Sequence, residues 1–125
     1  VIYLCRNDVS YSMVYLNERV QELTGYNATE FLAGTINFVQ LYHPDDAPAV
    51  FEKVDKALGL HKNFQLEYRI QHKNGDWRWV EEVGVGVYRN GQLALIEGFI
   101  CDITERKKIE LNIKKMADEN NRIFN

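Results

Sequence analysis

The fold of this chain is specified by residues 63–106, NFQLEYRIQHKNGDWRWVEEVGVGVYRNGQLALIEGFICDITER. Two Asn-Gly pairs, Asn74-Gly75 and Asn90-Gly91, separate three runs that are rich in β-forming residues. Asn-Gly favours the tight turn of a β-hairpin because the central residues of that turn need positive φ. The stretch therefore predicts three antiparallel strands joined by two tight turns.

The first of these strands alternates between apolar and polar residues. Phe64, Leu66, Tyr68 and Ile70 fall on one face, a pattern that predicts a half-buried strand. The two strands that follow carry apolar residues on both faces. We therefore expect a partner chain or a flanking helix to cover the outer face of the sheet.

Upstream of this stretch, residues 1–6 and 11–16 predict an opening pair of strands. Short helical signals follow. Asn17 is placed to cap a first helix, and Asn27 with Glu30 has the spacing of a capping box for a second. The order of strands, small helices and further strands predicts an α+β fold.

The longest helix before the tail follows His43-Pro44-Asp45-Asp46. Pro44 ends the preceding turn, and an aspartate is expected to accept hydrogen bonds from the free amides of the new helix. An apolar stripe runs from Val50 to Leu58, and Gly59 is expected to close the helix.

The C-terminal residues change from the strand pattern to a heptad pattern. Their spacing of four and three positions predicts a coiled-coil seam, in which a polar Asn would fix the register. The seam consists of Ile109, Ile113, Met116, Asn120 and Ile123. Asp102 and Glu105 have the spacing of a capping box at its start. The alternative is a lone amphipathic helix that folds back on its own domain.

Composition limits the chain to one domain and a tail. It has 125 residues, of which 46% are hydrophobic, enough for one core. We predict a folded domain over residues 1–104 and a signalling helix over residues 105–125. The net charge of −3 argues against nucleic acid as a partner. No apolar run reaches the roughly 20 residues of a membrane span, so we expect no membrane contact by this segment.

The two cysteines, Cys5 and Cys101, are far apart and form no CxxC pair. This spacing favours reduced thiols and a cytoplasmic location, and it leaves open whether the two approach each other. Since Val1 begins in a strand pattern, we interpret the chain as a piece of a longer protein, whose membrane anchoring elsewhere stays open.

Motifs for chemistry are missing from the sequence. It has no Walker loop, GxSxG or HExxH, and its three histidines lack metal-ligand spacing. Glu81 and Glu82 would point to opposite faces of one strand, so they predict no acid–base pair. We therefore expect neither an enzyme nor a metal site.

The order of motifs resembles that of PAS domains of the bacterial sensory-box type, with their C-terminal PAC segment. The matching residues are Asn17-Glu18, 23–26, 43–46, 67–69, Gly75, 78–80 and 98–107. The resemblance implies a five-stranded antiparallel sheet in the order 2-1-5-4-3, with small helices on one face around a core that can hold a ligand. It also implies a relay into an output helix, usually in a parallel homodimer. The relay residues would be Asp102, Ile103, Thr104, Glu105 and Arg106.

Two cofactor classes known in this family fit the residues poorly. The light-oxygen-voltage branch resembles Gly-x-Asn-Cys-Arg-Phe-Leu-Gln, whereas here Gly34 leads into Asn37-Phe38-Val39-Gln40. The cysteine needed for covalent flavin photochemistry is missing. Haem-binding members carry a histidine within the long helix, and residues 45–58 contain none. The cofactor is left unknown.

The candidate pocket lies where the resemblance places the inner face of the sheet. Gly84 and Gly86 would leave space there, or would instead let a helix approach closely. An inward Glu82 would need a partner such as Tyr68, whereas a register slip would turn Glu82 outward. The full set of candidates is Phe38, Phe51, Phe64, Leu66, Tyr68, Val80, Glu82, Gly84, Gly86, Ile96 and Ile100.

These observations predict a sensory module that binds a small ligand or a partner and relays the change through a dimeric helix to a linked effector. A sensor histidine kinase of a two-component system is favoured over a diguanylate cyclase. The alternative is a dimerisation scaffold with a filled core and no ligand. The size of the void in the core distinguishes the two.

Overall fold

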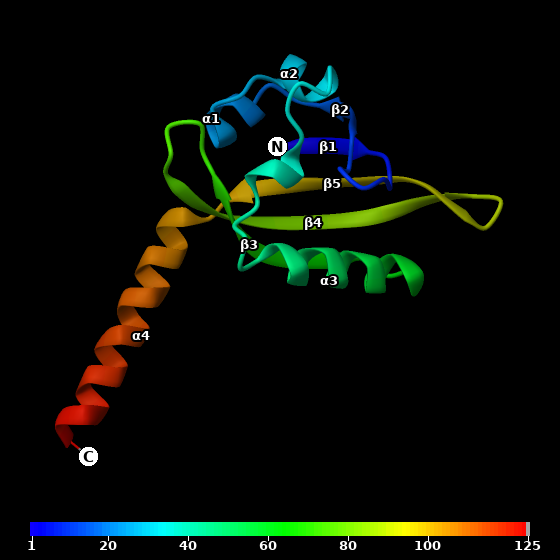
Figure 1. Ribbon diagram of the computed structural model, residues 1–125. Helices are drawn as coiled ribbons and strands as arrows, with labels where there is room; N and C mark the ends of the chain where they lie inside the picture. The colour runs from blue at the N-terminus through cyan, green and yellow to red at the C-terminus, as the bar shows by residue number, and fades with distance from the viewer. Residues whose placement is uncertain (125) are drawn as a thin grey trace.

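The computed structural model describes the backbone of residues 1–124 and the side chains of residues 1–122. In this part of the chain, a five-stranded antiparallel sheet has the order β2-β1-β5-β4-β3, as the resemblance implied (Figure 1). The strands are β1 (Ile2–Cys5), β2 (Met13–Leu16), β3 (Phe64–Gln71), β4 (Trp77–Arg89) and β5 (Gln92–Asp102). The helices are α1 (Val20–Thr24), α2 (Ala28–Leu32), the 3-10 helix η1 (Phe38–Leu41), α3 (Ala47–Gly59) and α4 (Thr104–Phe124).

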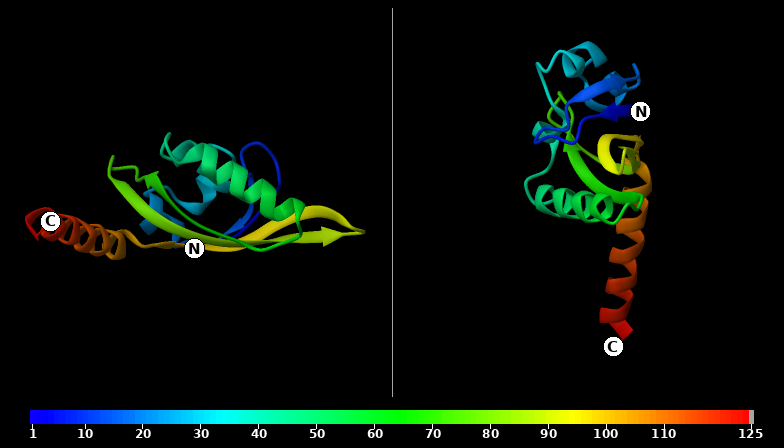
Figure 2. Two further views of the ribbon diagram at one scale, coloured as in Figure 1. Left: turned by 90° about the horizontal axis from the view of Figure 1, so that it is seen from below. Right: turned by 90° about the vertical axis from the view of Figure 1, so that its right-hand side faces the viewer.

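The hydrophobic core lies between the sheet and the helices that precede β3. Figure 2 shows these helices on one side of the sheet, with α4 extending away from it. On β3, Phe64, Leu66, Tyr68 and Ile70 are buried, and the residues between them are more exposed. The predicted alternation is confirmed, and it fixes the register, because a slip by one residue would expose all four.

The outer face of the sheet carries apolar side chains. Ile2, Tyr15 and Phe99 are 58%, 54% and 43% exposed. Apart from the base of α4, no element within residues 1–124 packs over this face (Figure 2). Its coverage by a partner chain stays a prediction.

The two Asn-Gly pairs form different connections. Asn90 and Gly91 have φ of 53° and 77°, and they make the predicted two-residue turn between β4 and β5. At the other pair, Gly75 has positive φ but Asn74 does not. The Asn74 Oδ1 accepts a hydrogen bond from the Asp76 backbone N at 2.9 Å, which stabilises a wider loop. The tight turn predicted between β3 and β4 is therefore wrong.

Asparagine side chains start α2 but not α1. The Asn27 Oδ1 accepts from the Glu30 backbone N at 3.0 Å, and the Glu30 carboxylate accepts from the Asn27 N at 2.9 Å, so the predicted capping box is confirmed. The predicted cap of α1 is wrong. That helix begins after Arg19, and the Asn17 Oδ1 instead accepts from the Ile2 N at 3.2 Å.

The predicted aspartate cap of α3 is wrong, and Gly59 is the last residue of the helix, not its cap. Asp46 stands at the N-cap, but its carboxylate makes no capping bond. It accepts from the Arg69 backbone N at 2.9 Å and from the guanidinium at 2.9 and 2.8 Å. Bidentate charged bonds are stronger than a cap to neutral amides. At the other end Gly59 is still helical, and the chain leaves through His61, which has φ of 53°.

The start of α4 departs from the predicted capping box. The Asp102 Oδ1 accepts from the Thr104 backbone N at 2.9 Å and from the Thr104 hydroxyl at 2.5 Å. These bonds to Thr104 occupy the Asp102 carboxylate. Glu105 lies in the first turn of the helix, but its carboxylate does not accept the hydrogen bond from the Asp102 backbone N that a capping box requires.

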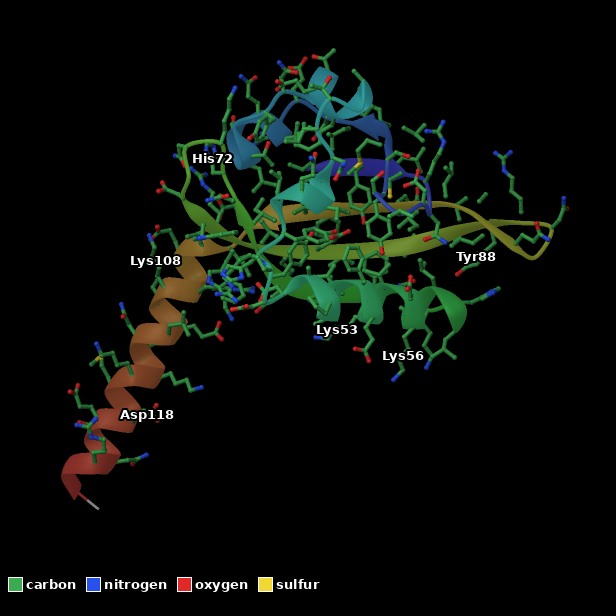
Figure 3. The ribbon with its side chains drawn as sticks, viewed as in Figure 1. Lys53, Lys56, His72, Tyr88, Lys108 and Asp118 are labelled. Carbon is green, nitrogen blue, oxygen red and sulfur yellow. The ribbon has the colours of Figure 1, made fainter. Side chains whose placement is uncertain are left out.

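The predicted seam on α4 faces solvent. Ile109, Ile113 and Met116 are 60%, 62% and 64% exposed, and Asn120 is also exposed. The helix projects from the domain (Figure 1), so the alternative in which it folds back is wrong. Figure 3 shows Lys108 near the base of this projecting helix and Asp118 farther along it, away from the sheet. The side chain of Ile123 lies outside the described residues, and coiled-coil pairing stays a prediction.

The cysteines lie on opposite faces of the sheet. Cys5 is buried and Cys101 is exposed, and both are free thiols. Cys5 pairs in register with Ile96, five positions before Cys101, so the two do not meet. None of the helices in residues 1–124 combines the length and the apolar character needed to span a bilayer.

Candidate ligand-binding site

A buried carboxylate marks the inner face of β4. Glu82 is 8% exposed and alternates with the buried residues Val80 and Gly84, so it points toward the helices and not outward. The Tyr68 hydroxyl donates to the Glu82 Oε1 at 2.5 Å, and the Tyr3 hydroxyl donates to the Oε2. The predicted need for a partner is met by two phenols, one of which the sequence did not indicate.

The path from Tyr3 to Glu82 crosses a strand. Tyr3 lies on β1 and Glu82 on β4, with β5 between them. Tyr3 stands opposite Gly98 of β5, which in turn stands opposite Gly84 of β4. Because this pair of glycines carries no side chains, the ring of Tyr3 can lie across β5 and reach the carboxylate.

Burial controls the acid–base behaviour of this cluster. Desolvation raises the pKa of Glu82, while the hydrogen bonds from Tyr3 and Tyr68 act in the opposite direction. Burial, followed by the nearby Glu82 carboxylate, raises the pKa of both tyrosines and of Tyr42 far above the ordinary value. The phenols therefore stay protonated and act as donors.

A small cavity adjoins Glu82. Its volume is about 20 Å³, which is room for a water molecule or a group of one or two non-hydrogen atoms. The lining residues are Tyr3, Cys5, Tyr11, Met13, Phe38, Tyr42, Val54, Phe64, Glu82, Ile96 and Ile100. Within residues 1–122, no lysine, arginine or histidine lines the cavity.

The glycines of β4 do not leave the space that the sequence suggested. A Cβ on Gly84 would meet the ring of Phe64, with one ring atom at 2.7 Å, and a Cβ on Gly86 would meet Leu93 and Tyr88 at 2.8 Å. Neighbouring strand side chains therefore fill both positions. The alternative of a closely approaching helix is not found either, because the side chains at these positions come from the sheet.

The structure brings together part of the predicted pocket. Phe38, Phe64, Glu82, Ile96 and Ile100 line the cavity. Leu66, Tyr68, Val80 and Gly84 are buried in the core around it, and Phe51 and Gly86 are half-buried. Sequence reasoning missed Tyr3, Cys5, Tyr11, Met13, Tyr42 and Val54. The alternation of Tyr3 and Cys5 on the first strand, combined with the strand order, could have indicated the first two.

The predicted relay residues join β5 to α4 and attach the helix to the sheet. The Ile103 backbone N donates to the Trp79 O at 2.9 Å. The Thr104 hydroxyl accepts from the Trp79 N at 3.1 Å. The Arg106 guanidinium pairs with the carboxylate of Glu67.

Lys107 strengthens this attachment, although it was not among the predicted relay residues. Its ammonium lies 3.1 Å from the Glu67 carboxylate and 4.7 Å from the centre of the Trp79 ring. A cation over an indole face adds attraction. The base of α4 is thus held by both charged and aromatic contacts.

Histidines lie in positions that stabilise the fold. His43 packs against Trp77 with ring centres 4.5 Å apart. His61 stacks on Tyr88 at 4.1 Å, near the end of the β4–β5 hairpin where Figure 3 labels Tyr88. In the part of the chain that the structure describes, no group of His, Cys, Asp or Glu side chains is arranged to hold a metal ion.

The two thiols are expected to differ in reactivity. Burial, followed by the negative charge of Glu82, raises the pKa of Cys5 to about 12, and thiolates are the reactive form. Under native conditions a thiol reagent should label exposed Cys101 first and Cys5 roughly 100-fold more slowly, because Cys5 reacts only through opening of the fold. Mass spectrometry of Cys101→Ser and Cys5→Ser variants would measure the two rates. Equal rates in the native protein would contradict the buried position of Cys5.

Comparison with known proteins identifies the family. The family model described as PAS fold matches residues 13–100. The chain belongs to this family, whose members are sensory modules, and the resemblance in the sequence is confirmed.

Similar proteins include named sensors, and the chain spans only about a tenth of the length of one curated relative. The chain is 32% identical over 113 residues to the methyl sulfide methyltransferase-associated sensor of Methanosarcina acetivorans. The matched region covers 88% of this chain and 11% of that protein. A sensory box histidine kinase/response regulator from Burkholderia thailandensis has a similar fold, with a TM-score of 0.81 and 24% identity over 97% of this chain and 89% of that one. The N-terminal domain of a diguanylate cyclase with a PAS/PAC sensor from Marinobacter aquaeolei has a TM-score of 0.72 and 18% identity over 85% and 96% of the two chains.

Proposed function

We propose that this chain is the sensory module of a longer signalling protein, in which occupancy of the Glu82 cavity alters the position of α4. The observation that carries the proposal is the buried Glu82 carboxylate beside a cavity. A carboxylate is costly to bury, and a scaffold would be more stable with an apolar side chain in its place. Buried, perturbed acids in a cavity are typical of functional sites.

The site is close to the helix along the sheet. Glu82 pairs in register with Ile100, two positions before Asp102, and β5 continues through Asp102 into α4. A displacement of Glu82 would therefore reach the base of α4 through one strand. The relay would comprise Asp102, Ile103, Thr104, Glu105 and Arg106, with residues 1–104 as the sensory domain and residues 105–125 as the output helix.

The linked effector is proposed from the relatives. Both a histidine kinase and a diguanylate cyclase occur as parent proteins among the structures with this fold. We favour a sensor histidine kinase as the effector, with a diguanylate cyclase as the second choice. Two free thiols favour a cytoplasmic module.

A dimerisation scaffold is the competing function. The observation that favours it is the cavity volume of about 20 Å³, since pockets for drug-sized ligands are roughly 300 Å³ or larger. Native mass spectrometry of the freshly purified chain separates the two functions. A retained small molecule supports sensing. A chain without a bound molecule, whose dimer is unaffected when Glu82 is changed, supports the scaffold.

The seam on α4 provides a second test. Asn120→Leu should tighten self-association about tenfold and loosen its register, because a buried polar residue at this position costs stability while it specifies alignment. Analytical ultracentrifugation measures the affinity, and disulfide trapping of single cysteines along α4 measures the register. A Lys115→Leu variant, which changes an exposed residue off the seam, is the control. Association that does not respond to Asn120→Leu would count against a parallel helix pair.

A further inference from the structure

We propose that the cavity beside Glu82 binds a small ammonium-type cation, of the size and chemistry of methylammonium. The inference rests on the proposed sensory function and specifies the ligand class of the same site. It follows from the charge of the cavity, the nature of its walls and its size.

No cationic side chain faces Glu82 in the described lining of the cavity. The hydrogen bonds that Glu82 accepts from Tyr3 and Tyr68 favour its carboxylate form, against the desolvation that raises its pKa, and a bound cation would favour that form further. The other ionisable groups that line the cavity are Tyr11, Tyr42 and Cys5, and none of these becomes positive. A cation would supply the opposite charge that the described lining lacks, whereas a phosphate or carboxylate ligand would be repelled.

The walls are suited to a cation that carries methyl groups. Five aromatic side chains line the cavity: Tyr3, Tyr11, Phe38, Tyr42 and Phe64. Aromatic faces attract ammonium groups and pack against their methyl groups. A carboxylate accepts the N–H donors that an alkali ion does not have.

The size of the cavity selects the smallest members of this class. About 20 Å³ of space accommodates one or two non-hydrogen atoms. Met13, which lines the cavity, is flexible, so a second or third methyl group on the nitrogen would require its side chain to move.

The test uses the full chain with methylammonium chloride that carries an isotope-labelled methyl group, at near-neutral pH and constant ionic strength in sodium chloride. Binding should shift the methyl resonance upfield by ring currents and transfer magnetisation to aromatic protons. The affinity should fall at least about tenfold in Glu82→Gln, since removing the charge of a buried pair weakens binding strongly. The matched control is Glu52→Gln, which removes a negative charge from the exposed face of α3.

Several outcomes would overturn the proposal. They are equal binding by wild type and Glu82→Gln, equal occupancy by methanol, displacement by potassium chloride at the same concentration, and no upfield shift in the wild type. If Glu82→Gln did not fold, Tyr3→Phe would be used, with a smaller loss of affinity expected. Binding of methylammonium without a change in α4 self-association would refute the relay and leave the ligand class standing. A retained ligand of other chemistry would refute the class and leave sensing standing.

Discussion

Gly98→Ala is expected to destabilise the domain by about 3 kcal/mol and to lower the melting temperature by roughly 10 °C. A Cβ at position 98 would overlap the backbone carbonyl of Val83 and lie 2.8 Å from the Tyr3 hydroxyl and 2.9 Å from the Cα of Gly84. The first and third of these contacts are backbone atoms of the neighbouring strand, which cannot move without disturbing the sheet. The new methyl group would also displace Tyr3 from Glu82.

Gly59→Ala is the matched control for this substitution. Gly59 lies in the last turn of α3, and no atom outside its own helix and chain neighbours lies within 4 Å of the position of its Cβ. Alanine there should be neutral or stabilising by about 0.5 kcal/mol, because it lowers the entropy of the unfolded chain. Urea unfolding followed by circular dichroism measures both variants. Similar stabilities for the two alanine variants would show that β1, β5 and β4 are not packed as closely as described.

The sequence predicted local features well where one pattern dominated. The alternation in β3 and the turn at Asn90-Gly91 needed only neighbouring residues, and both are confirmed. The predicted aspartate cap of α3 is not formed, because Asp46, which stands at the N-cap, instead accepts charged hydrogen bonds from Arg69, 23 positions away. A long-range partner of this kind leaves no trace in local spacing.

The candidate site shows the same limit. The family resemblance placed Glu82 on the inner face and Tyr68 was named as a possible partner, but a register slip stayed open because apolar residues fall on both faces of this strand. Tyr3 is 79 positions from Glu82 and reaches it across β5, so local spacing alone does not indicate it and the strand order is also needed. The cavity volume depends on how the rings of Phe64 and Tyr3 fill the space over Gly84 and Gly98, which is a property of packing and not of pattern.

The Glu82→Gln substitution is expected to change how stability depends on pH. Burial raises the pKa of Glu82 in the folded protein above its ordinary value of 4.5. The folded state therefore holds this proton more tightly than the unfolded state. Its contribution to stability is fully present below the ordinary pKa and is lost as the pH rises toward the raised one. At pH values above the raised pKa, this contribution of Glu82 to stability is fully lost and changes no further.

Other carboxylates have the opposite effect. The pKa values of Asp8 and Asp46 are lowered, in each case first by a side-chain hydrogen bond, from Ser12 and Arg69 respectively. Their contribution is present above the ordinary pKa of 3.8 and is lost as the pH falls through the lowered values. The pH profile of the wild type alone therefore mixes two opposing trends, and the difference between wild type and Glu82→Gln isolates the buried acid.

The difference in unfolding free energy between wild type and Glu82→Gln is expected to change with pH in one direction. From about pH 4.5 upward, the stability of the wild type relative to Glu82→Gln should decline, with a slope of up to about 1.4 kcal/mol per pH unit for one proton, and then level off. Denaturant unfolding at a series of pH values measures it, and Glu52→Gln controls for the change in net charge. Parallel profiles for wild type and Glu82→Gln would mean that Glu82 titrates alike in the folded and unfolded chains. A carboxylate with that behaviour would not be desolvated beside the cavity, and the sensory proposal would lose the observation that carries it.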